Sequence, residues 1–275
     1  MNPEGSETMR HRVGQALEAV FDARPQTEVL RAARYVTQGA GHRWRGLMAA
    51  AAGSIFRADA EECVLPLAAA LEMMHAASLV LDDLPSMDNA QTRRGKPCVH
   101  LVFPRHVVDL LAVFLVNLAY GIVADHPPVS EGRRVRVVAL LGEMGSRLAR
   151  GQELDLALAT APASESALLD CYAHKSGSLF AAALAGGGLL CGAGEADAAA
   201  LREAGMKLGQ AYQILDDIAD GEEEAGRCTA VTLFGRDGAR ARAEELLVEA
   251  GRLFDRFGAA ADPLRGVLGQ ISPQQ

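Results

Sequence analysis

The sequence predicts an all-α protein in which residues 1–275 form a single domain of roughly ten helices. Composition is the first indication: 49% of the residues are apolar but only 5% are aromatic, and the abundant alanine and leucine have the highest helix propensities. Periodicity is the second, because apolar side chains recur every three or four residues over most of the chain. Third, clusters of Pro and Gly separate these stretches, yet none is long enough to link two domains.

Three periodic stretches are predicted to form long helices. The first covers residues 64–83 and should end near Asp83, because Pro85 disfavours helix in the residue before it. The second, residues 107–124, is almost wholly apolar, which predicts a helix buried on all sides that could also be an interface element. The third spans residues 201–219. Breaks are predicted at clusters of Pro and Gly, at residues 125–132, 160–166 and 186–197.

Charge and cysteine content exclude several classes of protein. The net charge of −8 comes without a basic stripe, so we expect no nucleic acid partner. The odd number of cysteines without CxxC spacing predicts reduced thiols in a cytoplasmic protein. The N-terminus lacks the apolar core of a signal peptide, and no apolar run is long enough and uncharged, so we expect no membrane span. The five cysteines are Cys63, Cys98, Cys171, Cys191 and Cys228.

A first cluster of acidic residues lies where the helix over residues 64–83 should end. In "LVLDDLPSMDNAQTRRG", Asp82, Asp83 and Asp88 are followed by Arg93 and Arg94. The C-terminus of a helix is the negative end of its dipole, so aspartates there are unfavourable unless a cation offsets them. Grouped carboxylates suit Mg²⁺, which binds through one or two carboxylates plus substrate phosphates. On this cluster alone, a solvated acidic loop is the alternative.

A second cluster lies in "GQAYQILDDIADG", on the third predicted helix. Gln213, Asp216 and Asp220 are spaced by three and four residues and share one helical face, with Asp217 beside them. Like charges at this spacing destabilise an isolated helix. If the two acidic helices face each other across a bundle, they form opposed carboxylate walls that could hold several Mg²⁺ ions around a diphosphate.

Six short motifs in order resemble the polyprenyl synthetase family, the trans-isoprenyl diphosphate synthases, and most of all the bacterial geranylgeranyl diphosphate synthases. "DDLPSMD" followed by "RRG" resembles the first aspartate-rich motif of the family, in the form with two extra residues, and "DDIAD" resembles the second. The other matches are "MMHAASLVLDD", "ARGQELDLAL", "YAHKSGSLF" and "AYQILDD". The resemblance extends from about Tyr35 to Gly235.

The resemblance implies a fold of the isoprenoid synthase type, with helices around a central cavity. It also implies a reaction in which isopentenyl diphosphate condenses with an allylic diphosphate, which can be dimethylallyl, geranyl or farnesyl diphosphate. The cofactor it implies is Mg²⁺, with three ions in each active site of a homodimer. We expect such an enzyme to stabilise a departing diphosphate by electrostatics.

The resemblance also assigns roles by position. Asp82, Asp88, Asp216 and Asp220 would bind metal, with Asp83 and Asp217 as further catalytic carboxylates. Arg93 and Lys175, with the adjacent Ser176, would bind the allylic diphosphate. Arg45, His75 and Arg94 would bind isopentenyl diphosphate, with Gln213 lining the site. Gln152 and Asp155 belong to a matching motif, although a capped or solvated turn is the alternative for them.

Helix geometry supports part of this assignment independently. His75 lies seven residues before Asp82, which is two turns on the same face and about 10 Å along the axis. One helix could therefore address two diphosphates. A core histidine with satisfied hydrogen bonds is the alternative for His75 taken alone, and an ordinary surface lysine is the alternative for Lys175.

Two features depart from the family pattern. The family's "GGKRxR" loop is "AGHRWRG" here, so His42 replaces a lysine, and a neutral imidazole binds phosphate less well than an ammonium group. After Asp220 only "GEEEAG" precedes "RCTAVTLFG". A family loop that normally helps to close the site is thus shortened, with Arg227 near the place of a lysine and Ala230 in place of a tyrosine.

The resemblance also predicts the product. The residues four and five before the first aspartate, Ser78 and Ala77, are small, which leaves room for a tail longer than C15 and favours geranylgeranyl diphosphate, a C20 product. A farnesyl diphosphate synthase is one alternative. The others are a class I terpene cyclase, disfavoured by the second aspartate motif, and a weakly active regulatory subunit, disfavoured because both motifs keep their aspartates.

Overall fold

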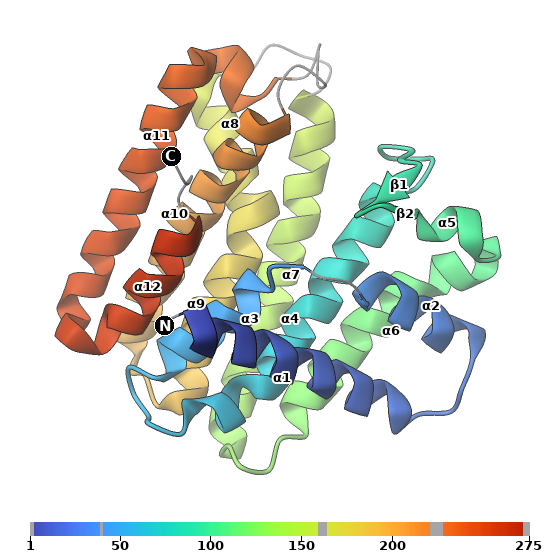
Figure 1. Cartoon of the computed structure of the whole chain (residues 1–275), viewed down its shortest axis with the longest axis horizontal. Helices are drawn as coiled ribbons and strands as arrows, with labels where there is room; N and C mark the ends of the chain where they lie inside the picture. The colour runs from blue at the N-terminus through green and yellow to red at the C-terminus, as the bar shows by residue number, and fades with distance from the viewer. Residues whose placement is uncertain (1–2, 39–40, 159–163, 221–227, 272–275) are drawn as a thin grey trace.

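The computed structural model describes residues 3–38, 41–158, 164–220 and 228–271, with only the backbone of Pro3 and Asp220. Within these residues the fold is almost entirely helical (Figure 1), so the prediction of an all-α fold is confirmed. The exception is a small antiparallel hairpin, β1 (Thr92–Arg93) and β2 (Lys96–Pro97), directly after the first acidic cluster.

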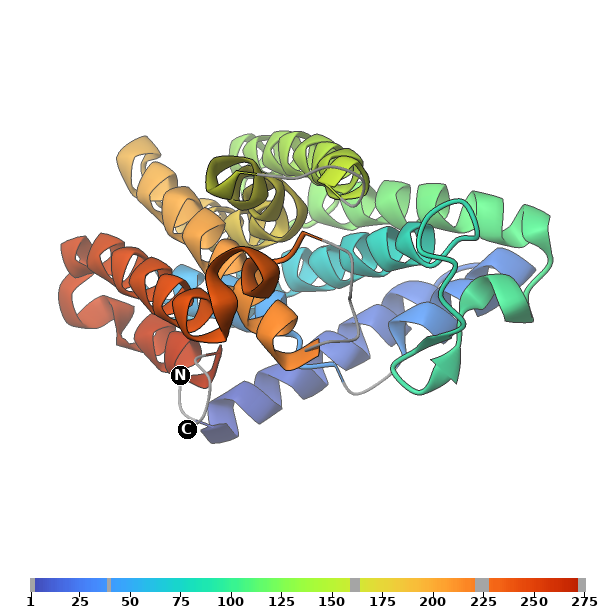
Figure 2. The same cartoon turned by 90° about the horizontal axis from the view of Figure 1, so that it is seen from above.

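The helices follow one another with short connections. In chain order they are α1 (Pro3–Asp22), α2 (Glu28–Thr37), α3 (Trp44–Gly53), α4 (Ala60–Asp82), α5 (Val99–Val102), α6 (Arg105–Ala124), α7 (Glu131–Leu158), α8 (Glu165–Tyr172), α9 (Ser178–Cys191), α10 (Glu195–Asp220), α11 (Ala230–Phe254) and α12 (Asp262–Ile271). A π-helical turn, η1 (Ala173–Gly177), joins α8 to α9, and a 3₁₀ segment, η3 (Asp255–Ala261), joins α11 to α12. Figures 1 and 2 show α11 and α12 at one end of the molecule and the hairpin at the other.

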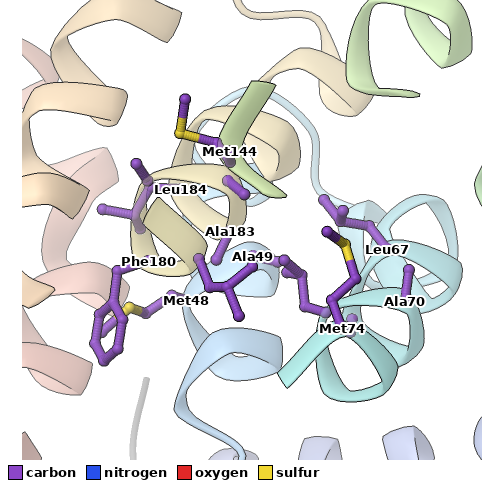
Figure 3. Close-up of a cluster of buried hydrophobic side chains, with 14 of the residues drawn as sticks. Met48, Ala49, Leu67, Ala70, Met74, Met144, Phe180, Ala183 and Leu184 are labelled. Carbon is purple, nitrogen blue, oxygen red and sulfur yellow. The ribbon is translucent and has the colours of Figure 1, made fainter. Parts of the chain in front are cut away.

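Helix α9 is the centre of the core. Every one of its residues is buried, and α3, α4, α7 and α10 pack around it. Figure 3 shows a part of this core, in which side chains from four helices meet: Met48 and Ala49 of α3, Leu67, Ala70 and Met74 of α4, Met144 of α7, and Phe180, Ala183 and Leu184 of α9. A core filled so largely by alanine and glycine lets the helix backbones approach closely.

The predicted break at residues 186–197 is wrong at its start. Gly186, Gly187 and Gly188 lie inside α9, which ends at Cys191 with Gly192 as its C-cap residue in the left-handed conformation, φ +115°. Close packing explains the glycines: a Cβ atom added at Gly187 would lie 2.2 Å from the carbonyl oxygen of Ala49 on α3. The break at residues 125–132 is confirmed by the connection between α6 and α7. The third predicted break is at residues 160–166, of which residues 160–163 lie outside the described part of the chain.

Helix α4 confirms the prediction for residues 64–83. It ends at Asp82, and Asp83 is its C-cap residue. The prediction for residues 201–219 is likewise confirmed by α10. Both acidic clusters therefore lie at the C-terminal ends of long helices that pack against the central α9.

The prediction that residues 107–124 are buried on all sides is wrong for one face of α6. Leu111 and Leu115 are buried, whereas Leu110 and Val113 are 54% and 60% exposed. A sequence that is apolar all round carries no amphipathic signal, so it does not reveal which face the fold covers. By length and composition alone, α4 and α6 would each be able to span a membrane.

We predict that Gly187→Ala lowers the free energy of unfolding by about 2–3 kcal/mol, because the added methyl group overlaps the α3 backbone. Gly132→Ala is the matched control, since this exposed helical glycine has no atom within 4 Å of its Cβ position, and alanine should stabilise the helix there by up to about 1 kcal/mol. Urea unfolding measures both. Equal effects of the two substitutions would contradict the close contact of α9 with α3.

Candidate functional site

The first two aspartates of the acidic cluster on α4 have different surroundings. Asp83 is only 3% exposed and accepts two hydrogen bonds from Arg93, from Nη2 at 2.6 Å and from Nε at 3.1 Å. Asp82 instead lines a cavity between α4, α6 and α7. The bidentate ion pair therefore fixes Arg93 in place, while Asp82 faces open space.

The β1–β2 hairpin presents the paired arginines. Arg94 and Gly95 at its tip both have positive φ, +54° and +76°, as a two-residue turn between twisted strands requires. The preceding segment folds back on the helix, because the backbone N–H of Asp88 donates to the carbonyl oxygen of Asp82 at 2.9 Å. The hairpin thus directs Arg93 to Asp83 and Arg94 to His75.

Burial dominates the electrostatics of Asp82. It raises the pKa of this carboxyl to about 6, with further increases from the charges of Asp88 and Asp155 that Lys175 and Arg93 partly offset. At neutral pH the buried carboxylate of Asp82 therefore carries a charge that its surroundings do not fully stabilise. A cation bound beside Asp82 would be stabilising.

Lys175 is the cation nearest to the centre of the site. Its Nζ pairs with Asp155 Oδ2 at 2.6 Å. Burial alone would lower the pKa of Lys175, but Asp155, Asp82 and Asp88 together raise it, so the side chain is charged. Lys175 lies in the π-helical turn η1, a feature that often marks functional sites. This turn packs tightly on α7, because a Cβ atom added at Gly151 would lie 2.3 Å from the backbone nitrogen of Lys175.

The second acidic cluster also has two kinds of environment. Asp216 is exposed. Asp217 is buried and accepts hydrogen bonds from the Tyr172 hydroxyl, from the backbone N–H of Ala230 at 2.9 Å and from Gln213 Nε2 at 3.3 Å. Asp217 therefore ties the start of α11 to α8 and α10.

Asp155 connects the two clusters. Its charge raises the pKa of Asp217 as well as that of Asp82, so both motifs lie near the Lys175–Asp155 pair. Ser176, next to Lys175, donates a hydrogen bond to Gln213 Oε1 at 2.6 Å. The side chain of Asp220 and the whole of residues 221–227, including Arg227, lie outside the described part of the chain.

A second group of cations surrounds His75. Arg94 Nη2 lies 3.2 Å from His75 Nε2. Burial and the charges of Arg45, Arg94 and Arg93 hold the pKa of His75 well below its ordinary value, so the ring is neutral and Nε2 accepts the hydrogen bond. The Arg45 guanidinium lies over the Phe180 ring, 5.2 Å from its centroid, and its Nε is buried without a hydrogen-bond partner among the described residues.

Glu72 is a site residue that the sequence reasoning missed. Its Oε1 is buried without a hydrogen-bond partner in the described part of the chain. Burial raises its pKa, and the charges of Arg45, Arg43 and Arg94 oppose this shift. The sequence feature that could have identified Glu72 is its position one turn before His75, in an otherwise apolar stretch of helix.

His42 lies at the edge of this group. It is exposed and stacks on Trp44, with ring centroids 5.4 Å apart and an interplanar angle of 14°. Its carbonyl oxygen accepts a hydrogen bond from Arg10 Nε at 3.0 Å. The His42 ring therefore packs on the first residue of α3.

The cavity between α4, α6 and α7 has a volume of about 770 Å³. Asp82 and Gln152 lie at its polar end, and the Nε2 atom of Gln152 is buried without a hydrogen-bond partner among the described residues. The other walls are largely apolar and include Ala77 and Ser78. Such a cavity suits an elongated ligand with a polar head and a hydrocarbon tail.

No group of three or more acidic, histidine or cysteine side chains in the described residues is close enough to chelate a metal. This does not conflict with a Mg²⁺ site, because Mg²⁺ retains water and uses one or two carboxylates together with substrate phosphates. The carboxylates of Asp82 and Asp216 are oxygen donors of the type that Mg²⁺ prefers, and the raised pKa of Asp82 shows that burial disfavours its charged form when no cation is bound.

The described geometry agrees with the similarity to known proteins. The polyprenyl synthetase family model matches residues 26–230. A geranylgeranyl diphosphate synthase of Pantoea ananas is 38% identical over 184 residues, which cover 62% of this chain and 60% of that protein. Another, of Pseudescherichia vulneris, is 32% identical over 96% of this chain and 89% of that protein. An FPP/GFPP synthase structure from Zymomonas mobilis, in its apo form, superposes with a TM-score of 0.88 at 30% identity, covering 98% of this chain and 100% of that chain.

We predict that Asp82→Asn stabilises the metal-free protein at pH 8 but not at pH 4. The folded pKa of about 6 lies above the ordinary 3.8, so the stability that protonated Asp82 contributes is complete below pH 4 and is lost as the pH rises through 6. Asparagine resembles the protonated form. The gain at pH 8 should be about 1–2 kcal/mol after allowance for solvent screening.

Thermal and urea unfolding in a chelating buffer measure this difference. Asp125→Asn, at an exposed aspartate, is the control and should change the stability little at either pH. A loss of stability of the Asp82 variant at pH 8 would contradict the unfavourable burial of the Asp82 carboxylate.

Proposed function

The chain belongs to the polyprenyl synthetase family, and on that premise we propose that it is a Mg²⁺-dependent short-chain prenyltransferase that makes geranylgeranyl diphosphate. One observation carries the proposal. Two acidic motifs surround the Lys175–Asp155 pair at the polar end of a largely apolar cavity. This arrangement suits a substrate whose diphosphate binds at the acidic end while its isoprenoid tail occupies the cavity.

The reaction couples three bond changes. The C1–O bond of the allylic diphosphate breaks, a C–C bond forms between C1 and the terminal alkene carbon of isopentenyl diphosphate, and a proton leaves C2 to create the new allylic double bond. The barrier lies in separating the allylic cation from the diphosphate anion, so fixed positive charge near the leaving oxygen accelerates the reaction.

The residues of the site can supply this stabilisation. When bound, Mg²⁺ would bring positive charge to the departing diphosphate, held by Asp82, Asp88 and Asp216, with Asp220 as a further proposed ligand. Lys175 and Arg93 would bind the same diphosphate, each fixed by its ion pair with Asp155 or Asp83. Asp217 would position α10 and α11 through its hydrogen bonds.

The second group of cations would bind isopentenyl diphosphate. Arg45 and Arg94 provide the charge, and neutral His75 orients Arg94. Glu72 is buried near these arginines, and their charges oppose the increase of its pKa by burial. The exposed His42 would contribute less than the lysine found in the family, because its imidazole is not permanently charged.

We also propose that the protein is a cytoplasmic homodimer without a membrane span. Leu110 on α6, which is exposed and is not among the residues that line the cavity, is suited to burial against a second copy. The five cysteines are free, which suits a reducing compartment.

The deciding experiment incubates the purified protein with Mg²⁺, isopentenyl diphosphate and each of the three allylic primers. The proposed enzyme elongates all three primers to C20. Conversion of an allylic diphosphate without isopentenyl diphosphate would instead indicate a terpene cyclase, and no conversion at all would favour a regulatory subunit.

Removal of one carboxylate should abolish most activity without unfolding the protein. We predict that Asp82→Ala and Asp216→Ala each lower kcat by a factor of about 10²–10⁴, a range typical of losses of electrostatic stabilisation. Chelation of divalent cations should abolish activity, and Mg²⁺ should restore it. Asp125→Ala is the control at an exposed position. Near-normal turnover of either variant, with unchanged circular dichroism, would remove the metal from the mechanism.

The middle of the cavity should be sensitive to the size of residue 77. Ala77 lines the cavity about five residues, or 7–8 Å along the helix axis, from Asp82. We predict that Ala77→Tyr shifts the main product from C20 to C15, because the ring obstructs the tail without reaching the diphosphate site. Chromatography of the products measures this, with Ala77→Gly as the control. If Ala77→Tyr still makes mainly C20, the tail follows another path.

A further inference from the structure

The cavity continues beyond Ala77 and Ser78. Its α4 wall reaches Met74, eight residues before Asp82, which is about 12 Å along the helix axis. Its α6 and α7 walls reach Tyr120 and Gly142. Ala77 and Ser78 therefore line the middle of the cavity, and a different group of residues must form its far end.

At this far end, Tyr120 of α6 and Met74 of α4 lie against two glycines of α7, Gly142 and Gly145. A Cβ atom added at Gly145 of α7 would lie 3.2 Å from Met74 Cε and 3.6 Å from the Tyr120 hydroxyl oxygen. At Gly142, one turn away, the nearest atom would be the same Tyr120 oxygen, at 4.0 Å. The missing side chains on α7 thus leave the space into which the Tyr120 ring extends from α6, beside Met74.

The walls between the two ends are largely apolar. The three polar side chains along them donate hydrogen bonds to carbonyl oxygens of their own helices: Ser78 to His75 at 2.9 Å, Asn117 to Val113 at 2.8 Å and Ser146 to Gly142 at 3.0 Å. A hydrocarbon tail can therefore lie along the walls without breaking these three hydrogen bonds. It stops where a side chain fills the cross-section.

The core behind this end is closed. Leu71, one turn beyond Met74 on α4, and Leu141, just beyond Gly142 on α7, are completely buried. A growing tail cannot enter this core without forcing apart side chains that are already close-packed, which is energetically unfavourable. Before it reaches this core, the tail is blocked by the Tyr120 ring and the adjacent Met74 side chain.

We infer that Tyr120 is the residue that ends chain growth, with Met74 completing the floor of the cavity. The inference rests on the proposed prenyltransferase function and adds to it the residue that sets product length. Small residues at positions 77 and 78 allow the tail to pass, and the Tyr120 ring stops it one to two helical turns further from the diphosphate site.

The test compares three substitutions at one position in the full-length protein. With Mg²⁺, isopentenyl diphosphate and farnesyl diphosphate, Tyr120→Ala should shift the main product by at least one isoprene unit beyond that of the unmodified chain. Tyr120→Phe should leave product length unchanged, because the ring and not the hydroxyl forms the stop. Tyr120→Leu, a less drastic truncation, should give an intermediate distribution. The KM for isopentenyl diphosphate should stay within about twofold, because Arg45, His75 and Arg94, which are proposed to bind it, do not line this cavity.

The outcomes separate the two proposals. If the unmodified chain does not condense the substrates at all, the proposed function fails. If it does and both Tyr120→Ala and Tyr120→Leu keep the original product length while remaining folded by circular dichroism, the floor assignment is overturned. A change of product length in Tyr120→Phe equal to that in Tyr120→Ala would also overturn it, because the ring would then not be the determinant. Should Tyr120→Ala fail to fold, Tyr120→Leu decides.

Discussion

The ion pair of Lys175 with Asp155 is the interaction around which the rest of the site is arranged. It holds one positive charge in a region where Asp82, Asp88 and Asp217 would otherwise face each other with little compensation. Its position depends on the π-helical turn η1, which the fold presses against Gly151 of α7 and Gly209 of α10. Lys175 and Arg93 are each already paired with a carboxylate, Asp155 and Asp83. The remaining carboxylates make the site suited to additional cations that arrive with a diphosphate.

The central helix makes this arrangement possible. Helix α9 is buried on every side and carries glycines at its contact with α3, so these two helices pack closely. Both α4 and α10 pack against this one helix. The electrostatic cost of placing acidic clusters at the negative ends of two helices is therefore offset by apolar packing elsewhere in the same helices. The apolar core stabilises the folded protein, whereas the carboxylates that repel each other lie where ligands are proposed to bind.

Much of this arrangement could be predicted from the sequence. Helical periodicity and Pro85 located the end of α4, and the spacing of acidic residues identified both clusters, because these features depend on neighbours within a few residues. The glycines of α9 were taken for a break, since composition does not distinguish a glycine that ends a helix from one that admits another backbone. The exposed face of α6 and the burial of Glu72 and Asp217 depend on partners far away in the chain. Local patterns carry no information about such contacts.

The most direct test of the central claim is calorimetry of diphosphate binding in the presence and absence of Mg²⁺. If the carboxylates form a site only together with the anion, Mg²⁺ alone should bind weakly, and inorganic diphosphate should bind at least about tenfold more tightly with Mg²⁺ than with a chelator, which corresponds to 1.4 kcal/mol of coupling. Asp82→Asn should remove most of this coupling. Equal affinity for diphosphate with and without Mg²⁺ would contradict the account, because the anion would then be bound by the basic side chains alone.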